Sequence, residues 1–108
     1  MPILKFKAIE AQKICSISKQ LVDELQVLLE CPRDYFTLEV AEEKFIRDGE
    51  FVDGNPVIKI SWFDRGQEIQ DKVAEKVTKY VNGIGYENVD IIFTVLEENK
   101  YYENGKHF

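Results

Sequence analysis

The sequence predicts an α+β fold made of two copies of one strand–helix–strand unit. The alternating segment Pro2–Phe6 returns as Pro56–Ile60, at an offset of 54 residues. An amphipathic segment of helical length follows each copy, and a second alternating segment follows each of these, at residues 36–40 and again at 91–95. The two units predict a four-stranded mixed sheet with two helices on one face. The strands within each unit should run parallel, because a helix crosses between them.

The first unit is expected to end near residue 41. Leu4 and Phe6 alternate with lysines in residues 3–9, which predicts a strand with one face toward a core. Residues 11–30 carry leucines and isoleucines at steps of three and four, which predicts a helix with one apolar stripe. Pro32 should end this helix, because the residue before a proline is pushed out of the helical conformation. A second strand is expected at residues 36–41.

The second unit follows a connection at residues 42–55. Asp-Gly pairs in this connection predict a loop with one short extra strand. Trp62 is expected to face the core from the next strand, and Asp64 is the expected N-cap of the second helix. The Asn-Gly pair in the tail predicts a hairpin. The elements expected after the connection are a strand at 57–63, a helix at 66–84, a strand at 89–97 and a hairpin within 101–108.

Length and composition limit the class of protein. A chain of 108 residues with 44% hydrophobic and 31% charged residues is expected to form one small domain, residues 1–108. No leader pattern or membrane-spanning apolar run is visible, so we expect a cytoplasmic protein without a membrane partner. A net charge of −6 with dispersed basic residues disfavours nucleic-acid binding. Cys15 and Cys31 lack metal or redox spacing and are expected to be reduced.

Pro2 directly after Met1, the repeated unit and the length of 108 residues together resemble the tautomerase superfamily of 4-oxalocrotonate tautomerase and macrophage migration inhibitory factor (MIF). More narrowly, the chain looks like a bacterial branch of that superfamily whose members have no assigned function. The segments that carry this narrower resemblance are PILKF at residues 2–6, YFTLE at 35–39, WFDRG at 62–66 and YYENGKHF at 101–108.

The resemblance implies a homotrimer with a pocket between subunits and Pro2 at the floor of that pocket. The implied activity is keto–enol tautomerisation, an isomerase reaction, on a small enolisable acid with no cofactor or metal. A free α-amino group titrates at ~7.7–8.0, and an apolar site lowers that value, so a free prolyl nitrogen can act as general base near neutral pH. This chemistry requires removal of Met1, which processing normally allows when a small residue such as proline follows.

Three further residues are candidates for binding the substrate. Arg65, at the mouth of the second helix, and Arg33, just after the first helix, can each grip a carboxylate through two parallel hydrogen bonds. Both also have a surface alternative, an ion pair with acidic residues next to them in the sequence. Trp62 can wall the pocket or belong only to the core.

The chain also departs from the families that it resembles. Cys31 and Thr37 fall where those families place a pocket lysine and a substrate-binding arginine. This departure leaves open a non-catalytic interaction protein on the same fold. A ferredoxin-like binding module has the same order of strands and helices, and it is the third alternative. Strand pairing separates the folds, because a ferredoxin-like sheet interleaves its two units.

Overall fold

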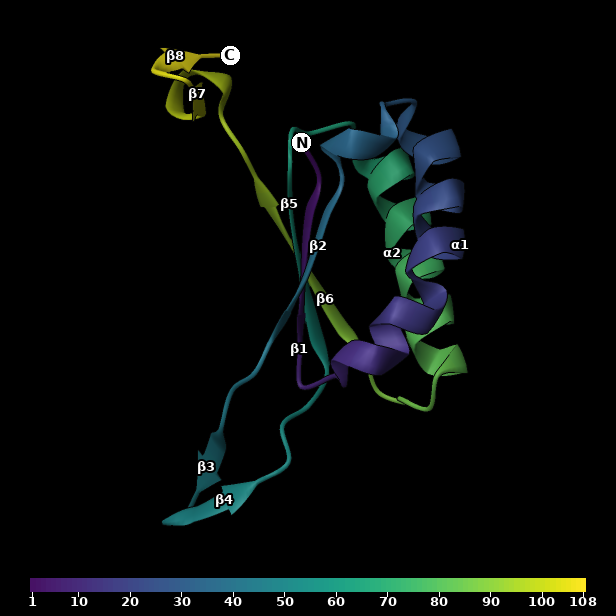
Figure 1. Ribbon diagram of the computed structural model, residues 1–108, viewed down its shortest axis with the longest axis vertical. Helices are drawn as coiled ribbons and strands as arrows, with labels where there is room; N and C mark the ends of the chain where they lie inside the picture. Colours follow the sequence, from purple (N-terminus) through teal and green to yellow (C-terminus); the bar gives the residue numbers. More distant parts are fainter.

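The computed structural model of the protein describes residues 1–108 and has two layers, a mixed four-stranded sheet and two helices that cover one of its faces (Figure 1). The opposite face of the sheet is uncovered (Figure 1). Neither helix is long and apolar enough to cross a membrane. The elements of the two layers are strands β1 (Ile3–Lys7), β2 (Thr37–Ala41), β5 (Val57–Trp62) and β6 (Asp90–Val95), and helices α1 (Ala11–Leu29) and α2 (Gln67–Gly83).

Strand pairing confirms the duplicated unit and the α+β fold class. The sheet order is β2-β1-β5-β6. Within each unit the two strands are parallel neighbours, β1 with β2 and β5 with β6, and the units join through the antiparallel pair β1–β5. Because each unit keeps its own strands adjacent, the interleaved order of a ferredoxin-like module is excluded.

The core lies between the sheet and the helices, and it follows the predicted alternation. Leu4 and Phe6 of β1 are 1% and 0% exposed, whereas Lys5 between them is exposed. Strand β5 repeats the pattern with Ile58 and Ile60. The helices contribute Ile14, Ile17, Leu21, Leu25 and Leu29 from α1 and Val73, Val77 and Val81 from α2.

Residues 42–55 contain a two-stranded hairpin rather than a loop with one extra strand. Strands β3 (Phe45–Arg47) and β4 (Glu50–Val52) pair antiparallel and extend away from the sheet (Figure 1). Asp48 and Gly49 both have positive φ, 48° and 80°, which is the backbone of a tight hairpin turn. The alternation over three residues on each side is too short to signal two strands in the sequence.

The tail forms the predicted hairpin. Strands β7 (Tyr102–Glu103) and β8 (Lys106–His107) pair across Asn104 and Gly105. This tail hairpin and the β3–β4 hairpin lie at opposite ends of the sheet (Figure 1). Tyr101 and Phe108 pack together with ring centroids 4.8 Å apart. Two short 3-10 turns, η1 (Arg33–Tyr35) and η2 (Glu98–Lys100), precede β2 and the tail hairpin.

Two local predictions were wrong. Strand β1 stops at Lys7 rather than continuing to Ile9, because Ala8 takes a left-handed conformation with φ of 61°. Asp64 is not the N-cap of α2. That position is held by Gly66, with φ of 90°, and the Asp64 carboxylate accepts a hydrogen bond of 2.9 Å from the Gly66 amide.

The two helices are also linked by a polar cluster of Glu24, Lys76 and Tyr80. The ammonium group of Lys76 lies 3.0 Å from the carboxylate of Glu24. A hydrogen bond from the Tyr80 hydroxyl, and then the one from Lys76, hold the pKa of Glu24 below its ordinary value of 4.5. The same contact raises the pKa of Tyr80 above its ordinary value of 10.0.

Truncating a fully buried leucine should destabilise the protein strongly. We expect Leu25→Ala, at a side chain that is 0% exposed, to lower the free energy of unfolding by about 2–5 kcal/mol. The matched control is Val27→Ala on the same helix, at a side chain that is 78% exposed, which should change it by less than about 0.5 kcal/mol. Urea denaturation measures both. Equal losses for the two variants would contradict the placement of α1.

The Glu24 cluster should make stability depend on acid pH. Because the folded pKa of Glu24 is lowered, its contacts stabilise the protein above the ordinary value of 4.5, and they are lost as pH falls through the folded pKa. Glu24→Gln should therefore lose less stability than the wild type between about pH 6 and about pH 3 in thermal melts. The exposed Glu75→Gln is the control and should follow the wild type. Parallel curves for wild type and Glu24→Gln would refute this role.

Candidate functional site

Pro2 lies buried at the start of β1, between two aromatic residues of the neighbouring strands. Its carbonyl oxygen accepts a hydrogen bond of 3.0 Å from the amide of Thr37. Ile3 is paired with Thr37 on one side and with Ser61 on the other. One step further along these registers, Pro2 comes to lie between Phe36 and Trp62. Both of these neighbours pack in or against the core, so the walls beside Pro2 are apolar.

Arg65 lies at the same end of the molecule, in the connection between β5 and α2. Its Nη1 donates a hydrogen bond of 2.7 Å to the carbonyl oxygen of Leu29, the last residue of α1. Carbonyl groups at a helix C-terminus carry partial negative charge and are good partners for a guanidinium. The chain start, the end of α1 and the start of α2 thus meet at one edge of the sheet (Figure 1).

The electrostatics of this end favour a neutral amine. The pKa of the amino group of Met1 is lowered from its ordinary value of 8.0, first because burial disfavours the charged form and second because the Arg65 guanidinium repels it. The Cys31 thiol acts weakly in the opposite direction. Met1 is half-buried and Pro2 is buried, so an amine at Pro2 would lie one residue deeper in the same surroundings.

Trp62 is part of the core and a neighbour of Pro2 at once. Its side chain is 1% exposed, and its ring lies 5.0 Å from that of Phe93 between centroids. The indole Nε1 has no hydrogen-bond partner in the protein. A buried donor without a partner is unfavourable by about 1–3 kcal/mol, so this N–H is available to any acceptor that reaches it.

Of the four candidate residues, Arg33 is the one whose contacts do not connect it with Pro2, Arg65 or Trp62. Its Nη1 lies 2.5 Å from the Asp23 carboxylate, and its Nη2 donates to the carbonyl oxygen of Lys19 at 3.2 Å. Both contacts are with α1. The expected pairing with the adjacent Asp34 is absent, since Asp23 of α1 is the acidic partner instead.

The contact that holds Arg65 was missed from the sequence. The residues next to it suggested an ion pair with Asp64 or Glu68, whereas its partner is a backbone carbonyl 36 positions away. Every residue has a backbone carbonyl, so the types of residue in the sequence cannot predict which carbonyl Arg65 binds. The only usable signal was the end of the first helix before Pro32, which leaves the last carbonyls of α1 without helical donors.

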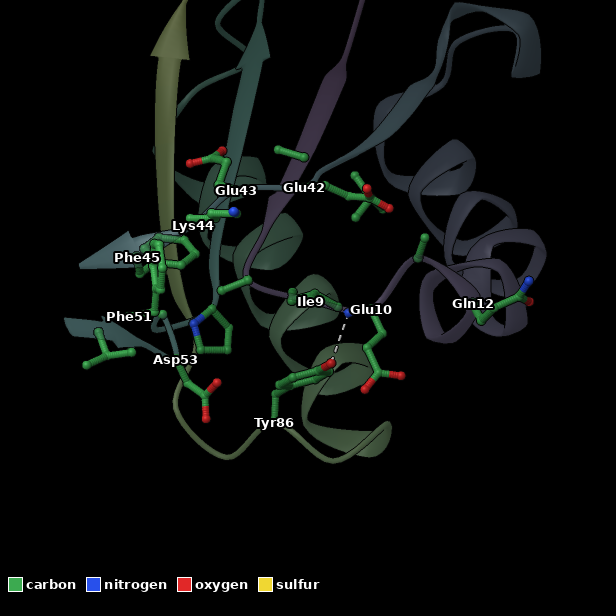
Figure 2. Close-up of a pocket in the computed structure, with 17 residues that line it drawn as sticks. Ile9, Glu10, Gln12, Glu42, Glu43, Lys44, Phe45, Phe51, Asp53 and Tyr86 are labelled. Atoms are coloured by element: carbon green, nitrogen blue, oxygen red, sulfur yellow. Dashed lines mark hydrogen bonds between the residues drawn. The ribbon is translucent and has the colours of Figure 1, made fainter. Parts of the chain in front are cut away.

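The largest of the three principal cavities lies at the other end of the sheet (Figure 2). It is a groove of about 1240 Å³ between the β3–β4 hairpin and the start of α1, and Pro56 is among its lining residues. Its main fixed contact is a hydrogen bond of 3.0 Å from the Glu10 amide to the Tyr86 hydroxyl (Figure 2). None of the three principal cavities is lined by Pro2. No group of acidic, histidine or cysteine side chains is arranged to bind a metal ion.

Comparison with protein families identifies the chain. The model of a domain of unknown function, DUF1904, matches residues 1–107. The chain belongs to the DUF1904 family. A DUF1904 domain from Sebaldella termitidis is 41% identical, with both chains covered over 100% of their length and a TM-score of 0.92. No curated protein matches the sequence.

Two further solved structures are similar to this chain, and one of them is an MIF-like protein. A protein of unknown function from Vibrio cholerae is 30% identical over 99% of this chain and 87% of that chain, with a TM-score of 0.88. An MIF-like protein from Entamoeba histolytica is 18% identical over 99% of this chain and 98% of that chain, with a TM-score of 0.75. At that identity the likeness shows the fold alone, and it confirms the tautomerase/MIF-like fold expected from the sequence.

Proposed function

We propose that this DUF1904 protein is a cofactor-independent keto–enol tautomerase, an isomerase whose general base is the nitrogen of Pro2 after Met1 is removed. The observation that supports this best is the buried position of Pro2 between the apolar side chains of Phe36 and Trp62. Burial and the Arg65 guanidinium lower the pKa of the amino group of Met1, the residue before it. A base that is neutral near pH 7 is what proton abstraction from carbon requires. The tautomerase/MIF-like fold supports the same activity.

The proposed reaction moves one proton and needs no other reagent. The neutral Pro2 nitrogen takes a proton from the carbon next to a carbonyl, and the electron pair of the C–H bond forms an enolate. The protonated nitrogen then returns the proton to the oxygen or to another carbon of the same molecule, so atoms and electrons balance.

The substrate proposed for this site is a small enolisable acid. Arg65 has donors beyond the one bound to Leu29, and these can hold a carboxylate. Trp62 offers its unpartnered N–H to an oxygen of the substrate. Arg33 is the outer carboxylate ligand in this proposal, and it can act only when its ion pair with Asp23 opens. Charge on the enolate would be stabilised by such donors.

The proposal includes a homotrimer in which a neighbouring subunit closes the pocket over Pro2. A single chain has no principal cavity at Pro2, so the site is open without a second copy. The uncovered face and edge of the sheet expose Ile92 and Val95 by 49% and 52%, and the β3–β4 hairpin exposes Phe51 by 72%. A second copy of the chain packed against these elements would bury these apolar side chains. We place the protein in the cytoplasm, where its free thiols persist.

The second candidate is a non-catalytic interaction protein on the same fold. It is favoured by the lack of a principal cavity at Pro2 in the single chain and by the engagement of Arg33 with Asp23. Intact mass of the purified native protein separates the two functions. If Met1 is retained, the Pro2 nitrogen is an amide without basicity and the binding function stands instead.

Replacing the proposed base should remove catalysis and leave the fold intact. In Met1-free protein, we expect Pro2→Ala to lower kcat for a panel of enolisable 2-oxo acids by about 100-fold or more, the range in which general bases contribute. The control is Pro56→Ala, at the equivalent strand start in the second unit, where the nitrogen is an amide in any form of the protein. Ultraviolet absorbance of the enol follows the rate. An unchanged rate for Pro2→Ala would exclude Pro2 as the base.

The trimer should depend on the β3–β4 hairpin. Light scattering of the wild type should give three times the chain mass of 12.6 kDa. Phe51→Ser should shift the protein toward smaller species, because an exposed aromatic at an interface is lost. Val27→Ser, at a side chain 78% exposed on the outer surface of α1, should leave the mass unchanged. A monomeric wild type at all concentrations would contradict the proposed assembly.

A further inference from the structure

The groove of about 1240 Å³ between the β3–β4 hairpin and the start of α1 takes no part in the proposed reaction. It lies at the opposite end of the sheet from the chain start (Figure 1). Of its 17 lining residues 9 are hydrophobic, and four of the others are acidic, Glu10, Glu42, Glu43 and Asp53. The single basic residue in the lining is Lys44. Apolar walls with a few charged groups are the usual composition of a small-molecule site.

Two aromatic rings of the groove are held in place by the backbone around them. The Phe45 ring of β3 packs so closely on Gly54 that a Cβ atom at Gly54 would lie 2.5 Å from it. Tyr86, from the connection between α2 and β6, is tied to the start of α1 by the hydrogen bond of 3.0 Å from the Glu10 amide to its hydroxyl. The groove therefore has an aromatic wall that is already formed before any ligand binds.

Three of the four acidic side chains of the groove have no basic partner. Glu43 forms an ion pair of 3.3 Å with Lys7. None of the ion pairs of the protein includes Glu10, Glu42 or Asp53, and all three are exposed. The groove therefore keeps an excess of negative charge that a positively charged ligand can neutralise.

The chain itself places ammonium groups on the rings at this end of the molecule. The Lys13 ammonium lies 5.0 Å from the centre of the Tyr86 ring, and the Lys44 ammonium lies 5.1 Å from the centre of the Phe51 ring. These are cation–π contacts, in which the electron density of the ring attracts a positive charge. The aromatic rings and the carboxylates thus favour the same kind of charge.

We propose that this groove is a binding site for an organic cation, a small molecule that carries a primary ammonium group on an apolar body. The ammonium group lies near the carboxylates of Glu10 and Asp53, which flank the Tyr86 ring in the view of Figure 2. The apolar body packs against Phe45 and Pro56. The inference goes beyond the proposed function, since it concerns another site and a ligand of opposite charge to an enolisable acid.

The test is an NMR titration of protein labelled with ¹⁵N-glycine. One probe is 2-phenylethylamine, which is protonated at neutral pH, and the other is 2-phenylethanol, a neutral molecule of nearly the same shape. The chain has 6 glycines, and Gly54 is the one that lines the groove, so its signal reports binding there. The amine should move the Gly54 signal with a Kd lower than that of the alcohol by about fivefold or more. The signals of Gly66 and Gly105, outside the groove, should stay fixed.

This comparison uses the wild type alone and does not depend on the folding of a variant. Equal Kd values for the amine and the alcohol would mean that the groove does not select charge, and they overturn the inference. A Gly54 signal that neither probe moves overturns it as well.

Two variants test the carboxylates directly. Glu10→Gln and Asp53→Asn should each weaken binding of the amine by about threefold and leave binding of the alcohol unchanged, because only a charge is lost. Glu75→Gln, at an exposed acidic side chain of α2 outside the groove, is the matched control and should bind the amine as the wild type does. Unchanged binding of the amine in both groove variants contradicts the proposed site.

Two further variants separate this site from the chain start and from the contact between subunits. Pro2→Ala should bind the amine as the wild type does, because Pro2 lies outside the groove. Loss of binding in Pro2→Ala would place the amine at the chain start and refute the inference. Binding to Phe51→Ser but not to the wild type would mean that a second copy of the chain fills the groove, which also refutes it.

Discussion

The antiparallel pairing of β1 with β5 is the constraint on which the rest of this structure depends. It joins the two units, and it places Leu4 opposite Ile60 and Phe6 opposite Ile58 so that all four side chains enter one core. Side chains alternate between the faces of a sheet, so a shift of one residue would turn this set of four toward solvent. The same register brings Trp62 across from Pro2. The candidate site is therefore a consequence of core packing and not a separate addition to it.

The helices add the electrostatic part of the site. The end of α1 supplies a carbonyl oxygen, and the connection into α2 supplies Arg65, so the two crossovers of the duplicated fold meet over the chain start. A neutral carbonyl orders the guanidinium without cancelling its charge. Burial and this charge act in the same direction on an amine, and together they describe a site suited to a neutral base.

Much of the fold was readable from the sequence, and the reason is its periodicity. The repeat of Pro2–Phe6 as Pro56–Ile60 located two strands, and the apolar stripes between alternating segments located the helices. The tail hairpin followed from Asn104 and Gly105, whose left-handed conformations the pair favours. These signals are local or regular, so a single sequence reveals them.

The parts that were missed depend on contacts between distant segments. The β3–β4 hairpin has strands of three residues, too short to show a period. Arg65 binds a backbone carbonyl, and Arg33 selects Asp23 over its neighbour Asp34 because the turn after α1 points it back along the helix. Pro2 itself was found from the sequence, since its position after Met1 is a chemical feature that needs no partner.

The second proline of the repeat has a consequence for what the far end of the sheet can do. Pro56 directly precedes β5 as Pro2 precedes β1, and it lines the large groove at the far end of the sheet. Its nitrogen is bonded to Asn55 in every form of the chain, so it has no basic lone pair. The two ends of the duplicated unit are therefore chemically unequal, and a molecule that enters the groove meets acidic and aromatic side chains instead of an amine.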